Sequence, residues 1–93
     1  MTEKDELAEY IGEEVVVDTR TLYLYLGTLE GYADSFVTLR NVDVHDMSDS
    51  RSTKELYIMN VRRRGIGPNR AAVKIRQAVI VSVSLLSDVI VFD

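Results

Sequence analysis

The segment SFVTLRNVDVHD, residues 35–46, alternates like a β-strand but changes phase midway. Val37 and Leu39 share one parity, whereas Val42 and Val44 share the other. Successive side chains of a strand point to opposite faces, so this change requires a bulge or a sharp bend. Because bends of this kind close small β-barrels, the segment predicts a strongly bent sheet.

Strand-like patterns precede this segment. Residues 13–19 (EEVVVDT) and 21–32 (TLYLYLGTLEGY) predict two strands joined by a hairpin turn at residues 18–21. The second of these strands carries apolar side chains on both faces, which is typical of a strand in a barrel or at a subunit contact.

Further strands are expected after a polar loop. Residues 54–61 (KELYIMNV) alternate in the same way, and RRRGIGPNR, residues 62–70, is expected to be a basic turn. Residues 71–86 predict strands that close the sheet, with a kink near Gln77–Ala78, and the apolar tail 87–93 could form a last strand.

The N-terminus, residues 1–12, predicts one short helix. Thr2 is placed to cap it, with Asp5 at the capping-box spacing and Gly12 at its end. On one face of this helix we expect Leu7, Ala8 and Ile11. The 93 residues are thus interpreted as one mostly β domain, a short helix followed by five or six antiparallel strands in a partly open barrel. Barrels of the OB, SH3-like and Sm types all fit this pattern.

Composition narrows the class of protein. The chain has no cysteine, which excludes disulfides and a cysteine-ligated metal site, so oligomerisation is the remaining common route to stability for so small a chain. It has no run of about 20 apolar residues, and its acidic start is unlike a secretory signal. We therefore expect a cytoplasmic protein.

Charge is divided unevenly between the two halves of the chain. Residues 1–50 hold twelve Asp and Glu against three Lys and Arg, whereas residues 51–93 hold three against eight. The net charge of −4 argues against indiscriminate nucleic-acid binding. The asymmetry indicates either a charged interaction face or neutralisation of one half by the other.

The sequence offers little for catalysis. His45 is the single histidine, and a metal site with Asp43 and Asp46 is weakly supported because Asp46 lies on the opposite strand face. No nucleophile elbow is present, and GIGPNR, residues 65–70, lacks the spacing of a phosphate-binding loop. We expect no enzyme activity and no cofactor.

The basic segment allows two interpretations. Four arginines in nine residues, which are Arg62, Arg63, Arg64 and Arg70, are candidate phosphate contacts. Alternatively they pair with the acidic half, which we favour slightly because no aromatic residue interleaves them. Of the tyrosines that could stack on bases, at positions 23, 25, 32 and 57, most are expected in a core or subunit seam.

Two segments together resemble the Sm and Sm-like family, which includes bacterial Hfq. The first Sm motif of that family is similar to LGTLEGYADSFVTL, residues 26–39, with an extra Ala33 and with Thr38 where the family usually has Asn. The second is similar to AAVKIRQAVIVSVS, residues 71–84, where Gln77 replaces the usual Gly after Ile75 and Arg76. The DSFV run is closer to the Hfq version. The resemblance covers residues 7 to about 84.

The resemblance implies a fold, a partner and a site. The fold is a helix followed by a strongly bent five-stranded antiparallel sheet, with residues 47–69 as an elongated hairpin of variable length. By this resemblance we expect the subunits to form a ring, typically of six or seven in that family, in which the fourth strand of one subunit pairs with the fifth of the next. The partner is short single-stranded RNA, and the implied RNA-binding residues are Asp34, Phe36, Thr38, Arg76 and Gln77. Arg76 and Phe36 would contact a base, and Asp34 would hold Arg76 or a nearby amide.

Three functions therefore remain open. The first is an RNA-binding Sm-like ring. The second is an oligomeric Sm-fold scaffold without RNA binding, which Gln77, Thr38 and the sequence pI of about 4.9 favour. The third is a monomeric SH3-like adaptor that binds peptides.

Overall fold

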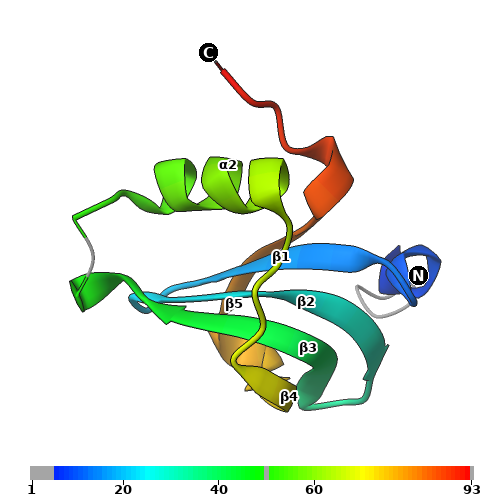
Figure 1. Ribbon diagram of the computed structural model, residues 1–93. Coiled ribbons are helices and arrows are strands. Elements are labelled where there is room, and N and C mark those ends of the chain that lie inside the picture. Colours follow the sequence, from blue (N-terminus) through cyan, green and yellow to red (C-terminus); the bar gives the residue numbers. More distant parts are fainter. Residues whose placement is uncertain (1–5, 50, 93) are drawn as a thin grey trace.

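The computed structural model describes residues 6–49 and 51–92 and has one antiparallel sheet at its centre (Figure 1). The spatial order of its strands is β4-β3-β2-β1-β5, so β4 and β5 occupy the two edges and the sheet is not closed. The expectation of a mostly β chain with a five-stranded antiparallel sheet is confirmed. The strands are β1 (Glu14–Thr19), β2 (Tyr23–Tyr32), β3 (Phe36–Asp46), β4 (Arg70–Arg76) and β5 (Ile80–Leu85).

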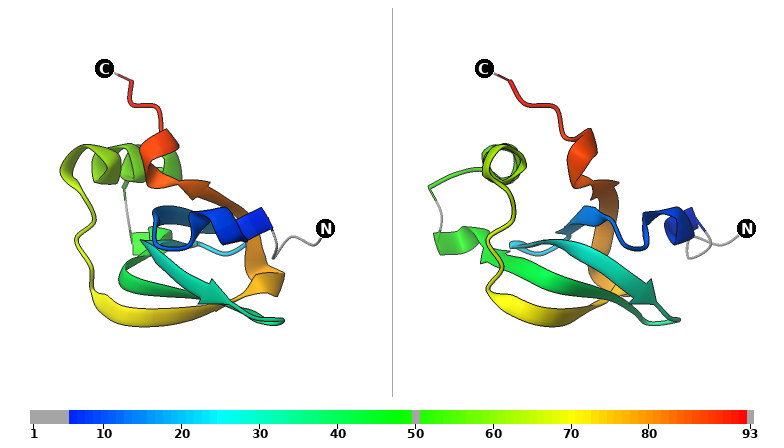
Figure 2. Two further views of the ribbon diagram at one scale, coloured as in Figure 1. Left: turned by 90° about the vertical axis from the view of Figure 1, so that its right-hand side faces the viewer. Right: turned by 45° about the vertical axis from the view of Figure 1, so that its right-hand side comes forward.

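A bulge divides β3 where the sequence changes phase. The β2–β3 register shifts between Leu26, which pairs with Asp43, and Thr28, which pairs with Arg40. Asn41 has φ 50°, in the left-handed region, and lies inside this shift. The predicted phase change is thus confirmed, and it turns Val42 back towards the core that Val37 and Leu39 occupy. Figure 2 shows that β2 and β3 are bent along their length.

The sheet has an apolar cluster on each face. On the inner face, Leu29, Leu39 and Val42 are fully buried with residues of β1 and β4. On the outer face, Leu24 and Leu26 are fully buried against Val61 and Leu86. The apolar character of both faces of β2 is therefore explained by two cores within one chain.

Residues 54–61 form a helix, so the predicted strand there is wrong, and so is the elongated hairpin expected at 47–69. Helix α2 spans Lys54–Arg64 and begins at Thr53, whose side chain accepts a hydrogen bond from Leu56 N at 3.2 Å. It ends at Gly65, which has φ 91° and donates to Val61 O at 2.7 Å. Tyr57, Ile58 and Val61 share one helical face and pack on the outer cluster.

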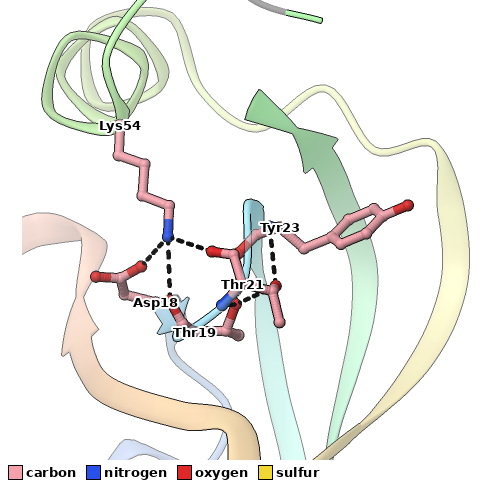
Figure 3. A network of polar contacts seen from close by, with 5 residues as sticks. All are labelled: Asp18, Thr19, Thr21, Tyr23 and Lys54. Carbon is pink, nitrogen blue, oxygen red and sulfur yellow. Dashed lines mark hydrogen bonds and ion pairs between the residues drawn. The ribbon is translucent and has the colours of Figure 1, made fainter. Parts of the chain in front are cut away.

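The first turn of α2 is anchored to the β1–β2 hairpin by Lys54 (Figure 3). Its ammonium lies 2.6 Å from Asp18 Oδ1 and donates to Thr19 O at 3.1 Å and Thr21 O at 3.0 Å. The Thr19 hydroxyl also donates to Tyr23 O at 2.8 Å, which holds the hairpin closed. The predicted turn at 18–21 is confirmed, and helix α2 is attached to it through Lys54.

The structure of the N-terminal end of the described chain agrees only partly with the prediction. Residues 6–10 are helical, with the 3₁₀ helix η1 at Ala8–Tyr10, but Ala8 and Ile11 are exposed and it is Leu7 and Tyr10 that pack on the inner core. Gly12 has φ 87° after the helical turn, while the capping contacts expected of Thr2 and Asp5 lie outside the described residues.

The tail does not form the last strand that the sequence suggested. A 3₁₀ helix, η4 (Leu86–Asp88), follows β5 and turns the chain towards α2 (Figures 1 and 2). Leu86 is buried in the outer cluster and Val89 packs against it, so the chain crosses this cluster instead of joining a sheet edge. No helix among the described residues is long and apolar enough to span a membrane.

Candidate functional site

The start of β3 and the end of β4 bring the two motif segments together. In the β3–β4 register, Phe36 is directly opposite Arg76 and Thr38 is directly opposite Lys74. Val37 and Ile75, which alternate with these residues, are buried in the inner core. The four residues opposite each other therefore lie on the outer face of the sheet, because side chains alternate between faces.

The central contact of the site joins Arg76 and Phe36. The guanidinium carbon of Arg76 lies 5.3 Å from the centroid of the Phe36 ring, within the range of a cation–π interaction. Arg76 is exposed and Phe36 is half-buried, so one side of the pair is open to a ligand. A planar cation and an aromatic ring next to each other offer two surfaces on which a nucleic-acid base can stack.

Gln77 fastens the turn between β2 and β3 to the end of β4. Its backbone N donates to Ser35 O at 2.9 Å, and its Nε2 donates to Ala33 O and, at 3.4 Å, to Phe36 O. Gln77 is not among the described residues with positive φ. The 3₁₀ turn η3 (Gln77–Val79) therefore has no need of a glycine here, and the glutamine supplies a tie that a glycine would lack.

Asp34 lies in the exposed turn before β3, next to Ala33 and two positions before Phe36. The turn is closed by the bond from Ala33 N to Phe36 O at 2.9 Å. Asp34, Phe36, Thr38, Arg76 and Gln77 are thus gathered at one end of the β3–β4 pair. Their predicted role in RNA binding stays a prediction.

A shallow, open depression lies beside Phe36. Its volume is about 450 Å³, and its lining includes Tyr32, Phe36, Thr38 and Lys74, together with Glu30, Gly31 and Ala33. Tyr32 and Lys74 were not among the predicted site residues. The alternation of charge in β4 could have identified Lys74, because it shares the parity of Arg76 and so lies on the same face.

The structure does not bring the four candidate phosphate-binding arginines to this end of the sheet. Arg62, Arg63 and Arg64 form the last turn of α2 rather than a basic turn, and Arg70 begins β4. Six residue steps along the strand place Arg70 about 20 Å from Arg76.

Two of these arginines also have structural contacts. Arg63 donates to Phe92 O at 2.7 Å and so holds the tail, while the Arg64 guanidinium lies 5.9 Å from the Tyr57 ring centroid. Any phosphate contact they make is separate from the Phe36–Arg76 site.

The residues considered for a metal site have other contacts. Asp43 is buried and accepts a hydrogen bond from the Tyr57 hydroxyl, and the His45 ring stacks on Tyr57 with centroids 3.9 Å apart. Asp46 accepts bonds from Ser48, which hold the pKa of this carboxyl below its ordinary value. In residues 6–49 and 51–92 no three His, Cys, Asp or Glu side chains converge as metal ligands.

The fold is shared with a solved Sm protein. The structure of the Pyrococcus abyssii Sm protein in complex with a uridine heptamer superposes with a TM-score of 0.62, at 14% sequence identity, over 91% of this chain and 99% of that one. The chain has the Sm fold. Neither a family model nor a curated protein sequence matches it.

The match supports the Sm-like resemblance without singling out the Hfq subtype. In terms of the Sm fold, the candidate site is formed where the β2–β3 turn meets the end of β4. Helix α2, which occupies the connection between β3 and β4, is anchored at the opposite end of β3 from this site, on the β1–β2 hairpin (Figures 1 and 3).

Proposed function

We propose that the protein binds short single-stranded RNA, with a base held at Phe36 and Arg76. The observation that carries this proposal is the Arg76 guanidinium at 5.3 Å from the Phe36 ring centroid, with one side of the pair exposed. Stacking of a base on an aromatic side chain contributes about 1–3 kcal/mol. The arginine adds a positive charge beside a polyanion.

Thr38, Gln77 and Asp34 complete the proposed site. Thr38 offers a hydroxyl that can donate or accept on the same face as Phe36. Gln77 fixes the turn that carries Asp34, through its bonds to Ser35 O and Ala33 O. The solved Sm protein of the same fold was bound to a uridine heptamer, which supports uridine-rich RNA as the first ligand to test.

We also propose that the subunits form a ring of six or seven. Both edges of the sheet, β4 and β5, are unpaired in the described chain, and unpaired edges are places where further strands add. Val81 on β5 is 62% exposed, so an apolar side chain lies at one of these edges. Pairing β4 of one subunit with β5 of the next would satisfy both edges, and a ring would hold several weak RNA sites together.

The proposed activity is binding rather than catalysis, and the cytoplasm is its proposed location. The role requires no cofactor, because stacking, hydrogen bonds and charge are all supplied by side chains of the chain itself.

Fluorescence anisotropy with a labelled uridine decamer tests this function. We expect saturable binding that weakens with salt. Arg76→Ala should lose about tenfold or more in affinity, because the variant removes the guanidinium, which supplies one of the two stacking surfaces and the positive charge. Arg20→Ala, an exposed arginine in the β1–β2 hairpin, is the charge-matched control and should bind like the wild type. Equal affinity of Arg76→Ala and wild type would refute the site.

A scaffold without RNA binding is the second candidate. It is favoured by Gln77, whose Nε2 is already committed to Ala33 O and Phe36 O, and by Thr38 in place of an amide side chain. An intact oligomer that binds no RNA homopolymer, even at low salt, would establish this role instead.

A further inference from the structure

The N-terminal segment and the end of α2 carry opposite charges. Residues 1–14 hold six Asp and Glu against one lysine, whereas residues 62–70 hold four arginines and no acidic residue. The sequence allows two explanations of this asymmetry, which are neutralisation of one half of the chain by the other and a charged interaction face. The ion pairs of the folded chain distinguish between them.

The charges of these two segments are exposed and do not pair with each other. Glu9 and Glu13 are exposed, and neither forms an ion pair within the part of the chain that the structure describes. Arg62 and Arg64 are also exposed and have no carboxylate partner there. The Arg64 guanidinium lies over the ring of Tyr57 instead. These four side chains are therefore not neutralised within one chain.

The sheet keeps the two segments apart. Leu7 and Tyr10 pack the N-terminal helical turn on the inner cluster, whereas Tyr57 and Ile58 pack α2 on the outer cluster. The acidic segment and the arginines thus belong to opposite sides of the sheet, and Figures 1 and 2 show them apart. A contact between the two charged segments requires a second molecule.

Each charged segment also exposes an apolar side chain. Ile11, which lies between Glu9 and Glu13 in the sequence, is 49% exposed. Phe92 is 70% exposed, and Arg63 in the last turn of α2 donates to its carbonyl oxygen at 2.7 Å. Burial of both apolar side chains in a contact would add a hydrophobic contribution to the attraction between the charges.

We propose that two copies of this chain bind head to tail, with the last turn of α2 of one copy on the N-terminal segment of the other. Charge complementarity favours a second copy as the partner, because the same chain supplies both signs. Each bound copy still has one unused charged segment, so a contact of this heterologous kind can continue from copy to copy.

The contact is separate from the proposed function. It uses neither Phe36 nor Arg76 and needs no RNA, and where β4 and β5 close a ring it joins one ring to the next. Pairs of exposed charges are individually weak and are screened by salt. We therefore expect the association at low salt and high protein concentration.

Analytical ultracentrifugation of nuclease-treated protein tests the contact. We expect the weight-average mass of the wild type to be about twofold larger in about 20 mM salt than in about 0.5 M salt. Arg62→Glu/Arg64→Glu has two acidic segments and Glu9→Arg/Glu13→Arg has two basic ones, so each variant alone should keep its high-salt mass at low salt. An equimolar mixture of the two variants brings opposite signs together again and should recover the rise.

Two further variants separate the contact from effects of net charge and of folding. Arg20→Glu/Arg51→Glu changes the net charge by the same amount at two exposed arginines outside the charged segments, and it should associate like the wild type. Because Arg64 contacts Tyr57, circular dichroism is used to check that Arg62→Glu/Arg64→Glu is folded. Arg62→Glu alone, at a side chain without such a contact, should reduce the rise as well.

Three results would overturn the inference. The first is a wild-type mass that does not respond to salt, and the second is a mixture of the two variants that does not recover the rise. The third is an equal loss of association in Arg20→Glu/Arg51→Glu, because net charge would then be the cause. If the wild-type mass is constant and Arg62→Glu/Arg64→Glu binds a uridine decamer more weakly, the arginines contact phosphate and not a second copy. The effect of Arg76→Ala on RNA binding bears on the proposed function alone.

Discussion

Phe36 and Arg76 meet because single residues set the path of β3. Asn41 at φ 50° allows the bulge, and Gly27 on β2 allows β3 to approach closely at that point. A Cβ added at Gly27 would lie 2.9 Å from Arg40 O and 3.2 Å from Val42 Cγ2. The bend that presents the outer face of β3 therefore depends on a residue without a side chain.

Gly27→Ala should destabilise the fold by about 1–3 kcal/mol, because the methyl group meets backbone that cannot move away easily. Urea denaturation followed by circular dichroism measures this change. Gly31→Ala is the matched control on the same strand: no atom lies within 4 Å of its added Cβ, so its midpoint should stay near that of the wild type. Equal midpoints for the two variants would show that the close approach at Gly27 is not required.

The two bonds of the Gln77 side chain provide a second test on the residue scale. Gln77→Ala should reduce the free energy of unfolding by about 1 kcal/mol, because Ala33 O loses the Nε2 donor and Phe36 O keeps only the bond from Ala33 N. It should also weaken RNA binding, since the turn that carries Asp34 and Phe36 is released. Denaturation and anisotropy on one preparation measure both effects. Unchanged stability would contradict a tie between the two motif segments.

The site residues could be found from the sequence only through the resemblance to a family. Periodicity places Phe36, Thr38, Lys74 and Arg76 on strand faces, but it does not show that the two strands pair in this register. Lys74 lies within residues 71–84, the segment similar to the second motif, but the resemblance assigns it no role, so it was not predicted as a site residue. Its place opposite Thr38 is a property of the register alone.

Helix α2 shows where sequence patterns mislead on the scale of elements. Tyr57, Met59 and Val61 alternate as in a strand, yet Tyr57 and Val61 are also one helical turn apart. The cap at Thr53 and the termination at Gly65 decide in favour of the helix, and both depend on local hydrogen bonds. By contrast, β1, β2 and the bulge in β3 were predicted correctly. The bulge could be predicted because a change of phase within a long alternating run fits a bulged strand and does not fit a regular helix.

The docking of α2 should depend on pH through Tyr57. Burial, and then the hydrogen bond to Asp43, raise the pKa of Tyr57 from 10.0 to about 12. The folded state thus holds this proton more tightly than the unfolded state, so its contribution to stability is complete below pH 10 and is lost as the pH rises towards 12. Unfolding free energies measured from pH 8 to 12 should fall across this interval.

Tyr57→Phe separates this contribution from those of the other tyrosines. It should cost about 1–3 kcal/mol at pH 7, because the Asp43 carboxylate, which is 5% exposed, loses a partner. It should also flatten the decline between pH 10 and 12. Tyr23→Phe, at a more exposed ring, is the control and should keep the decline. A decline of equal size in both variants would contradict the role of the Tyr57–Asp43 bond.

On the scale of the whole molecule, the open sheet edges are the main feature that a single chain leaves unexplained. Within residues 6–49 and 51–92, β4 and β5 have no neighbouring strand on one side, and Val81 is exposed on β5. The size of the chain and the absence of cysteine already indicated oligomerisation, but no sequence pattern fixes the number of subunits.

Native mass spectrometry tests the ring. The wild type should have six or seven times the subunit mass of 10.5 kDa. Val81→Lys places a charge at the β5 edge and should shift the population towards monomers, because a charge on an edge strand opposes pairing. Ser48→Lys adds the same charge in the exposed turn after β3 and should leave the mass unchanged. A monomeric wild type would contradict the ring.

The central claim is that RNA lies at Phe36 and Arg76, and photo-crosslinking with 4-thiouridine tests it most directly. A hexamer containing one 4-thiouridine is irradiated with the protein, and the crosslinked peptide is sequenced by mass spectrometry. We expect the crosslink in the peptide that carries Phe36, and its loss in Arg76→Ala. Crosslinks confined to the Arg62–Arg64 turn of α2, or equal yields in wild type and variant, would contradict the claim.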